Sequence, residues 1–158
     1  CSCSRCPQPW CLCGSDSMAV LYIHLIATVF MAGLIVFVQV VHYPLMAKVG
    51  DRAWVGYEQA HTVRTGWVVI PPMLAELASA VWIFAAATGD QAQGVALSGL
   101  ILLAFIWTST AVFQAPAHGR LVLGFDDEVH RWLVRSNWIR TAAWLGRVPI
   151  AVAMIATA

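Results

Sequence analysis

Charged residues are scarce in this chain of 158 residues. Asp, Glu, Lys and Arg make up 11% of it, whereas a soluble domain has roughly 25%. Hydrophobic residues make up 60%, and the mean hydropathy is +0.74. A soluble fold this small leaves much of its surface exposed and could not bury so much apolar area. The composition therefore excludes a soluble globular enzyme and a disordered chain, and it predicts an integral membrane protein.

The chain also lacks an excess of either charge sign. Nine Lys and Arg residues oppose eight Asp and Glu residues, which gives a net charge of +1. This balance implies no partner selected by electrostatics, and it excludes a nucleic-acid-binding protein. We expect the lipid bilayer to be the main partner.

Cysteine is absent after residue 13. The first 17 residues hold all five cysteines, which are Cys1, Cys3, Cys6, Cys11 and Cys13. Their spacing is not that of the paired Cys-x2–4-Cys motifs of zinc sites, and their number is odd. We expect residues 1–17 to be a leader outside the fold, with translation starting at Met18 and one domain over residues 18–158. A metal-binding or disulfide-bonded leader is the alternative.

Long stretches of the chain have almost no charge. Residues 17–47 and 91–119 have none, residues 65–89 have only Glu76, and residues 136–158 have only Arg140 and Arg147. A membrane-spanning helix needs roughly 20 mostly apolar residues. We therefore predict an all-α fold, a four-helix membrane bundle with antiparallel neighbours and spans near 19–43, 66–88, 95–116 and 138–157.

The second connection, around residues 88–94, has no basic residue. The first connection has Lys48, Arg52 and Arg64, and the third has Arg120, Arg131 and Arg135. The positive-inside rule then places connections one and three in the cytoplasm and both termini outside. We expect residues 51–64 and 125–135 to form short helices along the membrane surface. An interfacial aromatic belt should comprise Trp54, Trp67, Trp132 and Trp138.

The two halves of the chain share a pattern. Gln39 precedes Arg64 by 25 residues, and Gln114 precedes Arg140 by 26. This similarity favours two helical hairpins related by an internal repeat, which would place equivalent polar residues at one membrane level. Chance matching of common residues is the alternative.

Polar side chains gather at the cytoplasmic ends of the predicted spans. Gln39 and His42 share one helix face, and Gln114 and His118 are one turn apart. Polar residues inside membrane bundles are costly and usually functional. The candidate catalytic residues are His42, His118, Arg140 and Asn137, and the candidate substrate-binding residues are Gln39, Tyr43, His61, Gln114 and Trp144.

These residue types suit a lipophilic substrate with one ionisable oxygen. A histidine can accept a proton near neutral pH, and an arginine can stabilise the resulting anion. We expect an apolar cavity that opens toward the cytoplasm, with His61 and Asn137 at its mouth. The alternative is that these side chains only cap helix ends and contact lipid headgroups.

Two charges should lie at similar depth in the second and fourth spans. Glu76 is ten residues past Gly66, and Arg147 is ten residues past Asn137. An ionised group at that depth is costly unless it is paired. We therefore predict a structural ion pair between Glu76 and Arg147.

Metal and haem sites are alternatives at the polar ends of the spans. His42, His61, His118 and Glu76 have the donor types of a histidine–carboxylate metal site, and His42 with His118 could ligate a haem. The metal-free site is our preferred interpretation. No metal ligand is assigned, and the cofactor is left unknown.

A family resemblance depends on four short motifs in a four-span chain. The motifs are His42-Tyr43-Pro44, Pro71-Pro72 with Glu76, Gln114-x-Pro116-x-His118, and Ser136-Asn137-Trp138-Ile139-Arg140-Thr141. Over about residues 20–150 the chain resembles a bacterial family of uncharacterised small integral membrane proteins. More distantly it resembles the anthrone-oxygenase-like membrane family, whose last span also opens with Asn followed by Arg. The resemblance implies a bacterial inner membrane and the oxidation of polycyclic phenols without an obvious cofactor.

The leading hypothesis is therefore a membrane oxygenase or other oxidoreductase that acts on a lipophilic phenolic substrate. One alternative is an electron-transfer subunit that binds haem, metal or quinone. Another is a non-catalytic transporter or assembly protein. The expected partners are the bilayer and a lipophilic small molecule, with no nucleic acid, and a homo-oligomer is left open.

Overall fold

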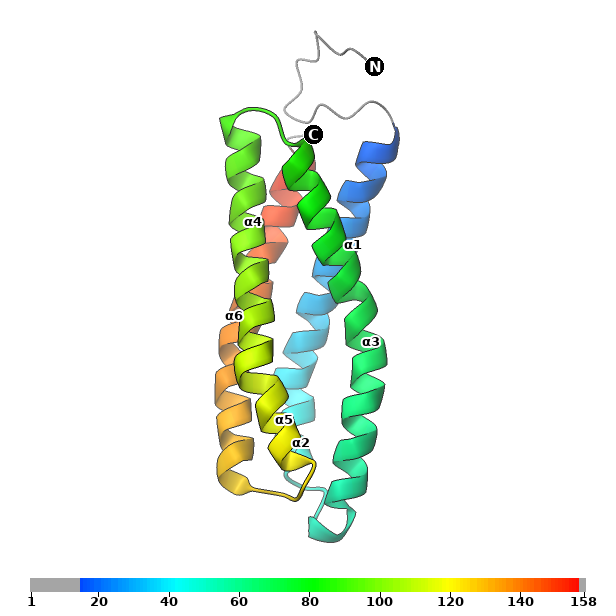
Figure 1. The fold of residues 1–158 in the computed structure, drawn as a ribbon, viewed down its shortest axis with the longest axis vertical. Helices are drawn as coiled ribbons and strands as arrows, with labels where there is room; N and C mark the ends of the chain where they lie inside the picture. Colours follow the sequence, from blue (N-terminus) through cyan, green and yellow to red (C-terminus); the bar gives the residue numbers. More distant parts are fainter. Residues whose placement is uncertain (1–14, 157–158) are drawn as a thin grey trace.

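The computed structural model describes residues 15–156, which form a four-helix bundle (Figure 1). The elements are α1 (Ser15–Phe37), the π-helix η1 (Val38–His42), α2 (Tyr43–Met46), α3 (Asp51–Ala86), α4 (Asp90–Ser109), the π-helix η2 (Thr110–Gln114), α5 (Ala115–Leu121) and α6 (Asp127–Ala156). The predicted all-α fold is confirmed. The five leader cysteines lie outside the described residues, whereas residues 15–17 belong to α1.

Four continuous helical rods are long and apolar enough to cross a membrane. They are Met18–Met46, Asp51–Ala86, Asp90–Leu121 and Asp127–Ala156. Their outer surfaces expose large apolar side chains such as Ile26, Trp67 and Ile101. A soluble protein rarely exposes so much contiguous apolar surface, whereas lipid solvates it. The described residues therefore form an integral-membrane type of bundle.

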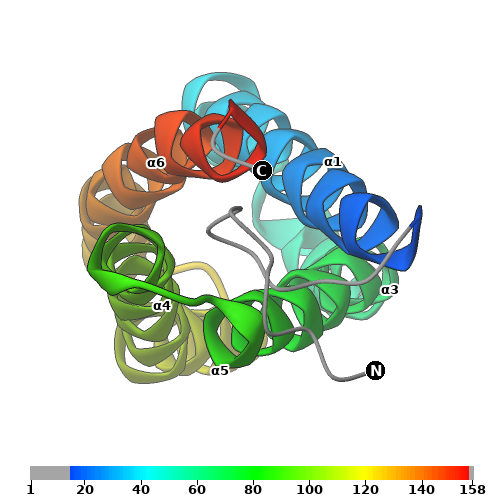
Figure 2. The same cartoon turned by 90° about the horizontal axis from the view of Figure 1, so that it is seen from above.

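The rods pack in a square, as the view along the bundle shows (Figure 2). α1 packs against both α3 and α6, and α4 packs against the same two helices from the opposite corner. Residues 47–50 and 122–126 connect the helices at one end, here named the lower end as in Figure 1. Residues 87–89 connect α3 to α4 at the upper end, where α1 begins and α6 ends.

The two surface helices predicted over residues 51–64 and 125–135 are wrong. Residues 51–64 and 127–135 are instead the first turns of the long helices α3 and α6. Trp54 is 1% exposed, and its Nε1 donates a hydrogen bond to the Leu121 carbonyl oxygen at 2.7 Å. It packs in a lower-end core cluster with Val129 and Leu133. These segments bury apolar side chains in the bundle, so continuing each span is favoured over lying on the membrane surface.

Trp54 therefore does not belong to the predicted interfacial belt. Trp67, Trp132 and Trp138 are all at least half exposed on the outer surface. These three side chains remain available to contact lipid.

The long helices begin with distinct caps. Gly50 and Gly89 precede α3 and α4 with φ of +81° and +85°, a backbone region that favours glycine. Before α6, the Asp126 Oδ1 accepts hydrogen bonds from the backbone N–H groups of Glu128 and Val129. These bonds, the one from Val129 foremost, lower the pKa of Asp126.

Each hairpin contains a π-helix directly before a proline-containing turn. η1 precedes Pro44, and η2 precedes Pro116. Proline lacks the N–H of a regular helical hydrogen bond, and a π-helical turn is one way to accommodate it. The shared order of a rod with a π-helix before its proline, a connection and one long helix supports an internal repeat.

The register of this repeat differs from the predicted one. Pro44 and Pro116 are 72 residues apart, whereas the predicted repeat pairs Gln39 with Gln114, which are 75 residues apart. Gln39 is therefore the second residue of η1, whereas Gln114 is the last residue of η2. The two glutamines are not equivalent in the structure.

Candidate functional site

A cavity of about 520 Å³ lies among all four rods. Its body is apolar and is lined by Met31, Leu34, Ile35, Val38, Val69 and Ile70. Its polar lining includes Tyr43, His61, Gln114, His118 and Arg140. An apolar body with a few convergent polar groups is typical of a small-molecule site.

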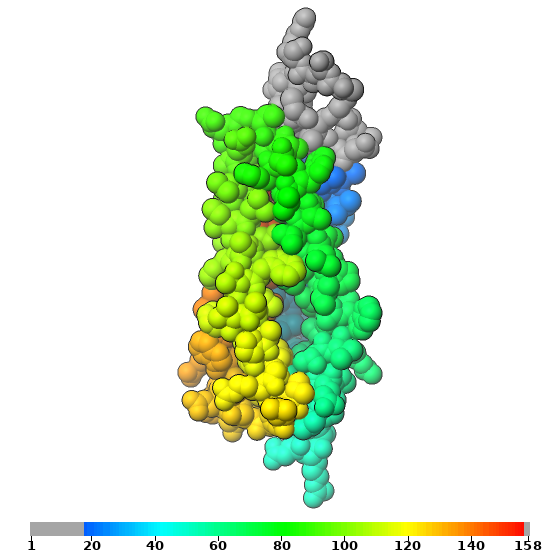
Figure 3. Space-filling model, in the orientation of Figure 1, coloured from blue at the N-terminus to red at the C-terminus, as the bar shows by residue number. Residues whose placement is uncertain are grey.

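The cavity opens to the side of the bundle between α3 and α5, and the expected opening toward the cytoplasm stays a prediction. The space-filling view shows a hollow between α3 and α5, with atoms of α1 at its floor (Figure 3). Small residues line the cavity on both of these helices, so they leave space between them. They are Gly66 on α3 and Ala115 and Gly119 on α5. The lower end is closed by the core cluster around Met46, Trp54 and Leu121.

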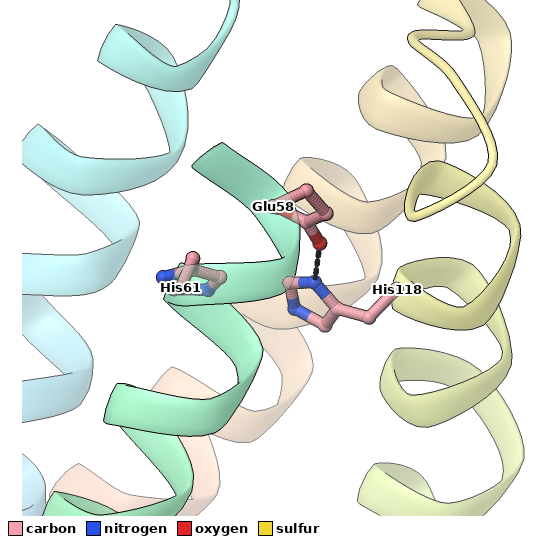
Figure 4. A group of neighbouring side chains, drawn as sticks. All are labelled: Glu58, His61 and His118. Atoms are coloured by element: carbon pink, nitrogen blue, oxygen red, sulfur yellow. Dashed lines mark hydrogen bonds and ion pairs between the residues drawn. The ribbon is translucent and has the colours of Figure 1, made fainter. Parts of the chain in front are cut away.

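His118 lies between Glu58 and Tyr43, and Figure 4 shows its ring directed toward Glu58. Its Nδ1 is 2.5 Å from the Glu58 Oε1, and its Nε2 is 3.1 Å from the Tyr43 hydroxyl. Glu58 is fully buried, and its Oε2 has no hydrogen-bond partner. The three side chains form a hydrogen-bonded chain from the cavity wall to a buried carboxylate.

His61 connects this chain to His42. The His61 Nδ1 is 3.0 Å from the His42 Nε2 and 3.0 Å from the Thr65 hydroxyl. The His61 ring centroid is 4.6 Å from that of His42 and 5.3 Å from that of His118. A single ring thus contacts both predicted haem ligands, so the geometry does not favour a haem between them. His42 itself lines a smaller neighbouring groove of about 240 Å³ and not the main cavity.

Arg140 is buried and is the residue of α6 that lines the cavity. Its Nη1 donates to the Asn137 Oδ1 at 3.3 Å, and the Asn137 Nδ2 donates to the Gln39 Oε1 at 2.8 Å. Gln39 in turn donates to the Val134 carbonyl oxygen at 3.1 Å. Neither Asn137 nor Gln39 lines the cavity, and Asn137 is fully buried. The prediction of Asn137 at the mouth is therefore wrong, because it packs behind Arg140.

The other two predicted binding residues differ from each other. Gln114 lines the cavity, and its side chain bonds Ser109 and Ser136 at 3.4 and 3.3 Å. Trp144 is fully buried in the core cluster that includes Met31 and Leu103, and it does not line the cavity. Trp144 is therefore a core residue. It lies one turn after Arg140 on the same face of α6, where that face packs against other helices and no longer borders the cavity.

The ion pair expected between Glu76 and Arg147 is present in the upper half. The Arg147 Nε and Nη2 lie 2.9 and 2.8 Å from the Glu76 Oε1, which also accepts a 2.6 Å bond from Thr28. His24 lies 3.4 Å from the Arg147 Nη2 and 2.9 Å from the Ser79 hydroxyl. Glu76 is therefore held away from the other three residues of the predicted metal alternative.

Glu58 is the site residue that sequence analysis missed. It replaces Glu76 as the carboxylate next to the histidines, since ligand atoms of Glu58, His61 and His118 all lie within 4.8 Å of one another. The available signal was the Glu58-x-x-His61 spacing, which places both side chains on one helix face. In helical bundles this spacing recurs where a carboxylate and a histidine act together on a metal.

No family model, curated protein or solved structure matches the chain. The family resemblance therefore remains an expectation from the sequence.

Proposed function

We propose that this protein is a membrane enzyme that takes a lipophilic phenol from the bilayer and deprotonates it as the first step of an oxidation. One observation carries the proposal. His118, backed by the buried carboxylate of Glu58, lines an apolar cavity that opens through the side of the bundle. A ligand dissolved in lipid can enter there without crossing a headgroup layer.

His118 is the proposed general base. In the tautomer with a proton on Nδ1, the ring donates to Glu58, and Nε2 accepts from the Tyr43 hydroxyl. A substrate hydroxyl that takes the place of Tyr43 would give its proton to Nε2. Glu58 would then stabilise the imidazolium, as the carboxylate does in a catalytic triad.

Arg140 is the proposed anion-stabilising group. Its guanidinium lines the cavity, and its one hydrogen bond among residues 15–156 is the bond to Asn137. Its Nε is buried without a partner. Donors therefore remain for a phenolate oxygen, in a water-poor cavity where such bonds are strong.

The proposed oxidation follows from the resemblance to the anthrone-oxygenase-like family. A deprotonated anthrone-type ring can take dioxygen at the carbon opposite its oxygen. One oxygen atom then stays as a carbonyl, and the other leaves as water. Dioxygen is apolar and dissolves well in the membrane from which the cavity opens.

Binding of a lipophilic nitrophenol to the protein in lipid nanodiscs tests the proposal, because the phenolate absorbs at a longer wavelength than the phenol. We expect wild-type protein to bind it as phenolate and His118→Gln to lose the phenolate signal. Arg140→Gln should weaken the signal, and Arg135→Gln, on the exposed side of α6, should not. Equal phenolate signals from wild type and His118→Gln would refute the proposed role of His118 as the base.

Oxygen uptake tests the oxidation itself. With anthrone as substrate, His118→Gln should slow oxygen uptake by about 10²–10⁴-fold, the usual contribution of a general base.

We also infer a bacterial inner membrane with both termini outside. The lower end carries the basic residues of the first and third connections, including Lys48, Arg52 and Arg120. The upper connection, residues 87–89, has no basic residue. The positive-inside rule places the lower end, and the polar end of the cavity with it, on the cytoplasmic side.

A further inference from the structure

We propose that Glu58, His61 and His118 form a binding site for one divalent first-row transition metal ion. The site shares His118 and Glu58 with the proton transfer proposed above, so a metal-bound His118 and a proton-accepting His118 are alternative states of one ring. Two histidines and one carboxylate are the donor set of mononuclear iron and zinc sites that keep open coordination positions.

The geometry needs only small movements. The candidate ligand atoms lie within 4.8 Å of one another, and the Glu58 Oε1 is 2.5 Å from the His118 Nδ1. Metal bonds of about 2.0–2.2 Å place ligand atoms roughly 3–3.5 Å apart. The distance between the Glu58 Oε1 and the His118 Nδ1 must therefore increase by about an ångström. The longest distance between ligand atoms must decrease by slightly more than an ångström. Side-chain rotation alone can supply both movements.

The charge of Glu58 points to a cation. Its side chain is fully buried, and among the residues that the structure describes one oxygen pairs with His118 alone and the other has no hydrogen-bond partner. Within residues 15–156, no lysine or arginine pairs with it. A buried carboxylate is costly without a positive partner, and a metal ion would supply that charge while engaging the free Oε2.

The outer ring nitrogens are already held in the manner of metal-bound histidines. The His61 Nδ1 contacts His42 and Thr65, which leaves its Nε2 free. The His118 Nε2 contacts Tyr43, which leaves its Nδ1 to face Glu58. In metal sites the second nitrogen of a ligating histidine nearly always bonds a neighbour, which fixes the ring. Both histidines also line the cavity, so a bound ion would border the space proposed for the substrate.

Cobalt and zinc titrations of the full-length protein test the site. All five leader cysteines are changed to serine in every sample, because thiolates bind the same metals. The protein carries no polyhistidine tag and is stripped with a chelator beforehand. We expect one equivalent of Co²⁺ to bind with visible ligand-field bands, Zn²⁺ to displace it, and the thermal midpoint to rise. Absence of stoichiometric Co²⁺ binding would overturn the proposal.

Variants identify the ligands. Glu58→Gln and His61→Gln should each weaken Co²⁺ binding by at least about 100-fold, and His42→Gln, which only orients His61, by about 10-fold. Glu128→Gln, an exposed carboxylate on α6, should bind like wild type. Unchanged binding in Glu58→Gln or His61→Gln, or its complete loss in His42→Gln, would show that the ligand set is wrong.

The same samples separate this site from the proposed function. Metal-free wild type should still convert the bound nitrophenol to phenolate if His118 is the base. Loss of that signal together with intact Co²⁺ binding would refute the proton transfer alone. Intact phenolate formation without Co²⁺ binding would refute the metal site alone.

Discussion

Arg147 joins α6 to each of the other three long helices. Its guanidinium donates to Glu76 on α3 and to the Gly99 carbonyl oxygen on α4, and it contacts His24 on α1. A side chain at Gly99 would meet Met154 at 3.1 Å, so a small residue keeps this approach open. The four helices thus meet at one buried cation, whose charge is balanced by Glu76.

Removing one partner of this ion pair should destabilise the bundle. Glu76→Gln leaves Arg147 charged and unpaired, and breaking a buried pair costs about 3–5 kcal/mol. The double change Glu76→Gln with Arg147→Met should recover much of the loss. Unfolding in detergent measures the free energies, and Arg135→Met on the exposed side of α6 is the control. Additive effects of the two single changes would show that the residues are not coupled.

Asn137 should act on Arg140 by positioning it. Asn137→Ala removes the acceptor for the Arg140 Nη1 and the donor to Gln39. The buried Gln39 oxygen loses its partner, which costs about 1–3 kcal/mol of stability. We expect weaker phenolate binding in the nitrophenol assay and unchanged Co²⁺ affinity. If Asn137→Ala lowers stability and leaves phenolate binding untouched, Asn137 serves packing only.

The sequence located much of the site but not its carboxylate. His61, His118, Gln114 and Arg140 do line one cavity. Glu58 was missed because residues 51–64 were expected at the membrane surface, where an acidic side chain would be solvated. Burial of Glu58 depends on α3 packing against α5, a tertiary contact that local composition does not report.

Helix-face arguments failed where the helix departs from 3.6 residues per turn. A shared face was predicted for Gln39 and His42 from their spacing. Both lie in η1, and the wider π-helical turn directs Gln39 to α6 and His42 to α3. η1 thus directs its two polar residues to different helices, and in the sequence only the following proline indicates it.

Substitution of Gly89, the residue before α4, tests where this helix begins. Gly89→Ala places a side chain at φ +85°, which should destabilise the protein by about 1–3 kcal/mol. Gly94→Ala is the matched control inside α4, where nothing lies within 4 Å of an added Cβ. It should stabilise by about 0.5–1 kcal/mol, because alanine loses less entropy in a helix. Equal thermal midpoints for the two variants would contradict the assigned backbone.

Across the whole molecule, the hydropathy of the sequence was enough to predict how many spans there are and in what order they follow. Each predicted span lies within one observed rod apart from a residue or two at the ends of the second and fourth. The rods are longer than predicted because their lower turns bury Trp54, Val129 and Leu133 against neighbouring helices. The sideways opening was not predictable, since it depends on how closely α3 and α5 approach.

The orientation of the bundle can be tested with reporter fusions. A reporter inserted at residues 89–93, and another after Ala158, should both behave as exported, because the basic residues cluster at the other end. A reporter inserted at residues 122–126 should stay in the cytoplasm and serves as the control. Cytoplasmic activity from either of the first two fusions would reverse the assignment.

If the proposed ligand enters between α3 and α5, lipid is the solvent from which it is drawn. Occupancy then follows the mole fraction of ligand in the bilayer, so adding lipid at a fixed amount of ligand empties the cavity by dilution. Adding buffer has little effect on a strongly partitioned compound. Suppose that affinity is expressed relative to the ligand concentration in water. Each methylene added to a ligand tail then makes the apparent binding free energy more favourable by about 0.8 kcal/mol, even if it touches no protein atom. Ligands of the proposed site should therefore rank by their partition into the membrane as well as by their contacts with the protein.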